Sequence, residues 1–264
     1  MSAAPLTARH ALVTGASRGI GAAIAQALAQ AGMHVTLLGR DQTALQATSA
    51  RLPLGTRHHI ELADVTDHKA MQRAIASASA ALGPVHVLVN NAGQALGGPI
   101  DQTSPALWAQ MLAVNLTGSY NAIYAALPSL RASATGADPA RIINVASTAG
   151  LQGYPQVSAY VAAKHGVVGL TRALALELAK DAITVNAVCP GYTDTVLAAQ
   201  AVESLARNTG KSPEQARALV VRRNPQQRLV APEEVAATVV WLCHPGSRGI
   251  NGQALAIDGG ELAG

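Results

Sequence analysis

The stretch TGASRGIG (14–21) separates two patterns of different period. HALVT before it is a short apolar run typical of a buried strand, and AAIAQALAQAG after it has the length and composition of a helix. The glycines allow a tight turn and a close approach of the backbone to a ligand. A helix that begins directly after such a turn offers free N–H groups and the positive end of its dipole to a phosphate group. The stretch therefore predicts a strand–turn–helix unit that binds a dinucleotide, although its glycine spacing differs from the usual fingerprint.

The rest of the chain repeats this alternation of short β-branched runs and longer helical stretches. Such a pattern is typical of parallel strands joined by crossover helices. Several runs are apolar at consecutive positions, as expected when helices cover both faces of a sheet. At 264 residues the chain fits one α/β domain. We predict strands at residues 10–14, 34–39, 58–65, 85–91, 140–147, 183–190 and 253–258.

The pattern loosens between residues 192 and 228. Helical stretches there are interrupted at Asn208-Thr209-Gly210 and at Pro213. An excursion of this length between core elements is more often functional than a simple linker. We therefore expect a substrate lid over 192–228.

Composition and charge restrict the function classes. The net charge is +4, but Lys and Arg are scattered and aromatics are few, so we expect no nucleic-acid partner and favour a phosphate-bearing small molecule. Cys189 and Cys243 lie far apart without metal-ligand spacing, which predicts buried thiols and no metal. The sequence has no run of about 20 apolar residues, so we expect no membrane span. The N-terminus does not resemble a secretory signal. The expected address is cytoplasmic.

The second predicted strand ends in VTLLGRD, where a dinucleotide site would place a carboxylate for the adenosine ribose. Gly39 stands at that position, Arg40 follows it, and Arg18 lies in the glycine loop. Two guanidinium groups favour NADP, whose 2′-phosphate pairs with arginine, with NAD as the alternative. Two other interpretations stay open: Arg40 caps the strand end while Arg18 is solvated, or Asp41 turns toward a ribose.

The glycine loop, NNAG (90–93), PGYTDT (190–195) and a Ser147, Tyr160 and Lys164 set together resemble the short-chain dehydrogenases/reductases, over about residues 10–260. The resemblance implies a single NAD(P)-binding Rossmann-type domain over 1–264, with a doubly wound parallel sheet of about seven strands and helices on both faces. It also implies a homotetramer. The cofactor contacts that it implies are Gly15, Ser17, Arg18, Gly19, Ile20, Gly21, Arg40, Asp64, Val65, Asn91, Ala92, Gly93, Tyr160, Lys164, Pro190, Gly191, Thr193 and Thr195.

Tyr160 and Lys164 are the candidate reacting pair. Reduction of a ketone needs a hydride at carbon and a proton at oxygen, and Tyr160 is the candidate general acid. Residues four apart share a helix face, so the Lys164 ammonium, together with the positive charge of an oxidised nicotinamide, is expected to lower the pKa of Tyr160. Ser147, thirteen residues earlier, is expected to polarise the carbonyl. By resemblance Asn115 kinks its helix and anchors a water relayed to Lys164; the alternative is a buried amide satisfied by backbone.

The prediction of the substrate rests on departures from two branches of the family. The chain resembles both hydroxybutyrate dehydrogenases and reductases of 3-oxoacyl thioesters, but Ala149 and Val157 replace the histidine and lysine with which the former hold a carboxylate, and Glu261 adds a negative charge near the C-terminus. We therefore predict a 3-oxoacyl/3-hydroxyacyl thioester. The alternatives are a cyclic, aromatic or polyketide ketone, or a catalytically silent nucleotide-binding interaction protein, against which the intact catalytic residues argue. The predicted substrate contacts are Gln94, Ser147, Gln152, Tyr154 and Tyr160.

Overall fold

The computed structural model describes residues 6–263, apart from the side chains of residues 197, 200, 201, 204 and 208. Within this part of the chain, seven strands form one sheet in the order β3-β2-β1-β4-β5-β6-β7, and every neighbouring pair is parallel. The order reverses between β1 and β4, which is where doubly wound folds bind their ligands. The predicted fold class is confirmed. The strands are β1 His10–Thr14, β2 His34–Gly39, β3 His58–Leu62, β4 Val85–Asn90, β5 Ala140–Val145, β6 Ile183–Pro190 and β7 Ala254–Ile257.

Four strands are shorter than predicted, and at two of them polar side chains bend the chain at the carboxyl end of the sheet. After β3, Asp64 accepts hydrogen bonds from the backbone N–H and the hydroxyl of Thr66. After β5, the Ser147 side chain accepts from the N–H of Ala149 and starts a short 3₁₀ turn. These local bonds compete with strand pairing. They end the strands next to the site.

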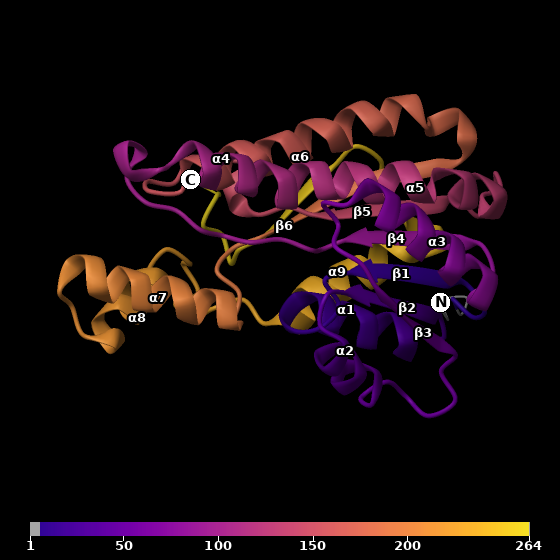
Figure 1. The fold of residues 1–264 in the computed structure, drawn as a ribbon, viewed down its shortest axis with the longest axis horizontal. Helices are drawn as coiled ribbons and strands as arrows, with labels where there is room; N and C mark the ends of the chain where they lie inside the picture. Colours follow the sequence, from indigo (N-terminus) through magenta and orange to yellow (C-terminus); the bar gives the residue numbers. More distant parts are fainter. Residues whose placement is uncertain (1–5, 264) are drawn as a thin grey trace.

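Helices cover both faces of the sheet (Figure 1). On one face α1 and α9 pack against the strands in a core that includes Ile24 and Val239, and on the other α3, α5 and the end of α6 bury Met71, Ala126 and Leu178. Both faces are aliphatic, which explains the continuous apolar runs in the sequence. The helices are α1 Gly19–Gln30, α2 Gln42–Ser49, α3 His68–Leu82, α4 Pro105–Leu112, α5 Gly118–Ser133, α6 Ser158–Glu177, α7 Val196–Thr209, α8 Pro213–Val221 and α9 Pro232–Cys243.

Helices α7 and α8 form a hairpin that projects beyond the sheet, at the left of Figure 1. A capping box of Ser212 and Gln215 starts α8, and a small cluster of Val202, Ala216 and Val220 holds the two helices together. A parallel bridge between Thr193 and Val230 closes the base of the hairpin. The excursion predicted from the sequence is therefore a separately packed arm beside the carboxyl ends of the strands.

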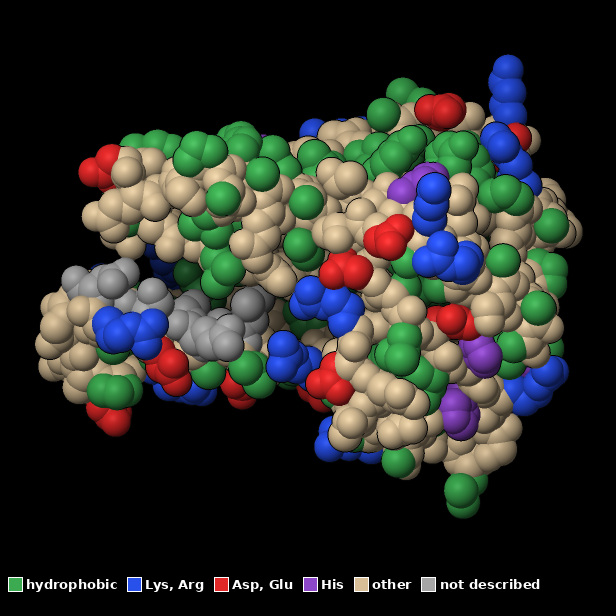
Figure 2. Space-filling model, viewed as in Figure 1, with side chains coloured by type: hydrophobic (Ala, Val, Ile, Leu, Met, Phe, Trp, Pro, Cys, Tyr) green, Lys and Arg blue, Asp and Glu red, His purple; other side chains and the backbone are tan. Residues whose placement is uncertain are grey.

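The surface offers no large basic area on the face seen in Figure 2, where Lys and Arg side chains lie among Asp and Glu. Of the helices in the described part of the chain, none has the length and apolar character needed to cross a membrane. Cys189 and Cys243 are buried free thiols.

Candidate active site

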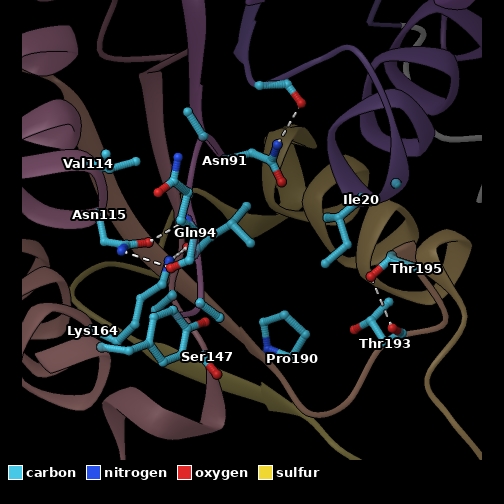
Figure 3. A pocket seen from close by; sticks show the side chains of 18 of the residues that line it. Ile20, Asn91, Gln94, Val114, Asn115, Ser147, Lys164, Pro190, Thr193 and Thr195 are labelled. Atoms are coloured by element: carbon cyan, nitrogen blue, oxygen red, sulfur yellow. Dashed lines mark hydrogen bonds between the residues drawn. The ribbon is translucent and has the colours of Figure 1, made fainter. Parts of the chain in front are cut away.

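A cavity of about 440 Å³ lies at the carboxyl ends of the strands. It is bounded by the glycine loop, the loops after β2 to β6, the start of α6 and the base of the α7–α8 arm. Of the predicted site residues, all but Gly21 and Gln152 line it. Figure 3 shows Asn115, Ser147 and Lys164 on one side of the cavity and Ile20, Thr193 and Thr195 on the other.

Backbone contacts shape the glycine-loop end. Gly15 has φ +65°, a conformation that favours glycine, and a Cβ there would lie 2.8 Å from the Cα of Ala92. The Asn91 side chain donates to the carbonyls of Thr14 and Gly15, at 3.0 Å each, and so ties the loop to β4. Gly21 was predicted to contact the cofactor, but it lies behind the loop, where a Cβ would collide with the carbonyl oxygen of Gly15. The lack of a side chain at this position lets α1 pack against the turn.

Two arginines line the same end. Arg40 Nη1 lies 3.3 Å from Asp64 Oδ2, with 64% of the Arg40 side chain exposed, and Arg18 is also exposed. Asp41 accepts from the N–H of Ala44 at 3.0 Å and caps α2, so its carboxylate is not turned toward the cavity as one interpretation required. Burial tends to raise the pKa of Asp64, but the hydrogen bonds from Thr66 and the charge of Arg40 hold it below its usual value.

Helix α6 places Tyr160 and Lys164 one turn apart, as the spacing predicted. Lys164 is 4% exposed, its Nζ donates to the carbonyl of Val145 at 2.8 Å, and it lies 5.7 Å from the centre of the Tyr160 ring. Burial lowers the pKa of Lys164 to about 8, because the charged ammonium loses its water. The amine is therefore held inside the site by a backbone carbonyl.

In the protein alone, burial dominates the pKa of Tyr160. Burial raises it to about 12, and a hydrogen bond with Ser147 offsets only part of that shift. The protein alone thus favours the neutral phenol, which is the proton-donating form. Lowering of this pKa by positive charge, as expected from the sequence, would have to exceed the effect of burial.

Asn115 lies at the centre of a π turn, Ala113–Thr117, between α4 and α5. Its Nδ2 donates to the carbonyls of Gln94 and Met111, at 2.9 and 3.0 Å, and its Oδ1 accepts from the N–H of Gln94 at 3.2 Å. The predicted helix distortion is present, and so are the backbone bonds of the alternative interpretation. Asn115 therefore fixes the backbone of Gln94, whose side chain accepts from Gln110 Nε2 at 2.8 Å.

At the other end of the cavity, which we call the substrate end, the Tyr154 hydroxyl is the centre of a cluster of hydrogen bonds. This hydroxyl lies 2.9 Å from Thr148 Oγ1, 2.7 Å from Glu261 Oε1 and 2.8 Å from Gln152 Nε2. Gln152, predicted to contact substrate, lies outside the cavity lining and instead donates to Tyr154. The carboxylate of Glu261 is the best acceptor for the single Tyr154 proton.

Three further polar side chains, which were not predicted as site residues, line the cavity: those of Thr148, Tyr192 and Arg223. Arg223 follows α8, and its guanidinium carbon lies 5.0 Å above the centre of the Tyr154 ring. Arg222 and Arg223 are adjacent, so nothing in the sequence indicated which one faces the site.

The arrangement defines a nucleotide-dependent oxidoreductase: a dinucleotide-binding loop at one end of the cavity, and a buried lysine with a half-buried tyrosine and serine lining the same cavity. A family model described as short chain dehydrogenase matches residues 9–206. The chain therefore belongs to the short-chain dehydrogenase family, whose members interconvert hydroxyl and carbonyl groups with NAD(P).

Individual relatives are similar to this protein over nearly the whole chain. A D-beta-hydroxybutyrate dehydrogenase of Cupriavidus necator is 39% identical over 260 residues, 98% of this chain and 99% of the relative. A putative ketoacyl reductase of Streptomyces coelicolor is 40% identical over 253 residues, 95% of each. The crystal structure of a variant of actinorhodin polyketide ketoreductase with NADPH superposes with a TM-score of 0.91 at 38% identity, covering 98% of both chains. These relatives are named for enzymes and give no support to a catalytically silent protein.

Proposed function

We propose that this protein is an NADP-dependent reductase of 3-oxoacyl thioesters, which also oxidises the matching 3-hydroxyacyl compounds. The observation that carries the proposal is one cavity lined by Ser147, Tyr160 and Lys164, with two arginines at its glycine-loop end. The relative named as a ketoacyl reductase supports the substrate class.

The residues fit a bound nicotinamide cofactor. Gly15 packs directly against the backbone of Ala92, and Gly15, Ser17 and Gly19 line the cavity, so the loop brings main-chain atoms to the place where a pyrophosphate would bind. The cofactor supplies the hydride that goes to the carbonyl carbon. Thr193 and Thr195, at the start of α7, would contact its carboxamide and phosphates.

In this proposal Tyr160 gives its proton to the carbonyl oxygen as the carbon accepts the hydride, so the products are an alcohol, oxidised cofactor and tyrosinate. Ser147 donates a hydrogen bond to the same oxygen. The Lys164 ammonium stabilises the negative charge that forms on Tyr160, and its bond to the Val145 carbonyl fixes its position.

The preference for NADP rests on Arg18 and Arg40. The Arg40 pair with Asp64 is exposed, and such pairs contribute about 1 kcal/mol or less, so Arg40 can turn to a 2′-phosphate at little cost. Asp41, the acid that would favour NAD, already caps α2. The neighbour crystallised with NADPH supports the same choice.

Steady-state rates with NADPH and NADH test this preference. We expect wild type to favour NADPH, and Arg40→Ser to lose roughly ten- to hundred-fold of that preference, the range for charge-assisted hydrogen bonds. Arg51→Ser is the matched control, because Arg51 is exposed and does not line the cavity. A wild-type preference for NADH would contradict the proposal.

A substrate panel tests the thioester. Ala149 and Val157 line the cavity and offer no charge or hydrogen bond to a free acid. We expect turnover of acetoacetyl-CoA with NADPH to exceed that of simple ketones. The reverse result would favour the second candidate, a cyclic or polyketide ketone, which the similarity to actinorhodin polyketide ketoreductase supports.

The proposal also covers the domain organisation and the oligomeric state of the protein. Residues 1–264 act as one domain, with residues 192–228 as the lid over the substrate. A homotetramer is supported by the exposed aromatic side chains of Trp108, Tyr120 and Tyr124 on α4 and α5. Light scattering at working concentrations measures the assembly, and a monomer would refute it.

A further inference from the structure

Arg223 brings a positive charge to the substrate end of the cavity. Among the described residues that line the cavity, the other basic side chains are Arg18 and Arg40 at the glycine-loop end and Lys164 beside Tyr160. Arg223 comes from the lid and lies against Tyr154, whose hydroxyl reaches Thr148, the neighbour of Ser147. The Tyr154 ring therefore lies between the Arg223 guanidinium and Thr148, next to the serine that would contact the reacting carbonyl.

The donors of Arg223 are not used within the described part of the chain. The guanidinium of arginine carries five N–H donors, and no hydrogen bond or ion pair from the Arg223 side chain is present among the described residues, whereas the Arg228 side chain is bound to Glu234 at 2.6 Å. Glu261 is close, but its Oε1 accepts from Tyr154 at 2.7 Å, and it forms no ion pair with Arg223. Arg223 thus presents a charge to the cavity that no described carboxylate pairs with.

The lid as a whole is basic. Residues 192–228 contain six Lys or Arg and three Asp or Glu, so this segment has a net charge of +3 in a chain of net charge +4. A positively charged segment beside the cavity attracts anionic substrates from solution. The stacking of the guanidinium on the Tyr154 ring also fixes its orientation, which reduces the entropy lost when it binds an anion.

We propose that Arg223 binds an anionic group of the substrate and so selects charged 3-oxoacyl compounds over neutral ketones. This inference rests on the proposed function and names the residue that the substrate end uses for recognition. Two groups share the required chemistry: a phosphate of the thioester's carrier and the carboxylate of a free 3-oxo acid. Arg223 would supply the cationic partner that Ala149 and Val157 do not offer.

Two matched substrate pairs test the inference in the full-length enzyme with NADPH. Acetoacetyl-CoA and the N-acetylcysteamine thioester of acetoacetate share the thioester, but only the first has phosphates. Acetoacetate and its ethyl ester differ in the carboxylate. The variants are Arg223→Ala and Arg223→Lys, with Arg222→Ala as the control, since Arg222 is an exposed neighbour that does not line the cavity. Circular dichroism and melting temperature establish that each variant is folded.

We expect Arg223→Ala to lower the ratio of kcat/KM for the charged over the neutral member of one pair by roughly ten- to hundred-fold, mainly through KM. Arg223→Lys should recover part of the ratio, and Arg222→Ala should leave it unchanged. A change in the CoA pair identifies a phosphate, and a change in the acid pair identifies a carboxylate.

Equal losses for charged and neutral substrates would show a purely structural role and overturn the inference. An unchanged ratio in both pairs, with good wild-type turnover, would overturn it while leaving the proposed function intact. Wild-type enzyme that reduces none of the four compounds refutes the proposed function, and the inference falls with it.

Discussion

The glycine-loop end and the substrate end of the cavity differ in how their parts are held. At the glycine-loop end the backbone itself forms the wall, and Asn91 bonds it to the neighbouring strand. At the substrate end three side chains from distant segments meet: Tyr154 before α6, Arg223 after α8 and Glu261 near the C-terminus. The first end is therefore held by backbone contacts, and the second by contacts between side chains. Between them lie Tyr160 and Lys164, which both ends serve.

The largest effect is expected at the centre. Tyr160→Phe removes the transferable proton without changing the ring, so kcat should fall about 100- to 10,000-fold, the usual contribution of a general acid. Fluorescence titration should give an NADPH affinity close to that of wild type. Turnover that survives the substitution would mean that another group supplies the proton.

Next in size is a change at the glycine-loop end. Gly21→Ala places a methyl group against the carbonyl oxygen of Gly15, and overpacking of this kind costs about 1–3 kcal/mol. We expect a lower melting temperature and weaker NADPH binding. Gly153→Ala is the control, because no atom lies within 4 Å of a Cβ at that position. If both variants behave alike, the backbone at the glycine-loop end tolerates an added methyl group and does not form a rigid wall.

The pH dependence of the reaction rate is expected to report the protonation of the buried Lys164. Lys164 carries its charge only below its pKa of about 8, whereas Tyr160, with a pKa of about 12, keeps its proton through this range. For reduction, kcat/KM for NADPH should therefore decline as pH rises above about 8, approaching ten-fold per unit. Initial rates between pH 6 and pH 10, in buffers of constant ionic strength, measure the profile. A flat profile would show that the ammonium stays protonated when the cofactor binds.

The smallest effect is expected at the substrate end. Tyr154→Phe keeps the ring under Arg223 but removes the hydroxyl that Glu261 and Thr148 contact, a loss of about 1 kcal/mol per hydrogen bond. KM for the oxoacyl substrate should rise a few-fold with kcat and NADPH affinity nearly unchanged. An equal loss of NADPH affinity would show that the two ends are coupled rather than separate.

The fold was largely predictable because its signals are local. Strand ends at Thr14, Gly39 and Pro190 match the predictions, since apolar runs and glycine turns act over a few residues. The strand ends after β3 and β5 were misplaced because Asp64 and Ser147 make side-chain bonds to the backbone that hydrophobicity does not reveal. Catalytic geometry was partly predictable for the same reason: the four-residue spacing of Tyr160 and Lys164 fixes their shared face of α6.

The sequence by itself determined the parallel α/β class, the glycine loop and the family, because these depend on residues close together in the chain or on motif spacing. Only the tertiary structure decided that Gly21 is a packing residue, that Asp41 caps α2, and that Gln152 serves Tyr154. It alone brought Arg223 and Glu261 to the same ring. The physical reason is that a side chain's partner is set by the packing of segments far apart in sequence, whereas turns and helix faces are set by neighbours along the chain.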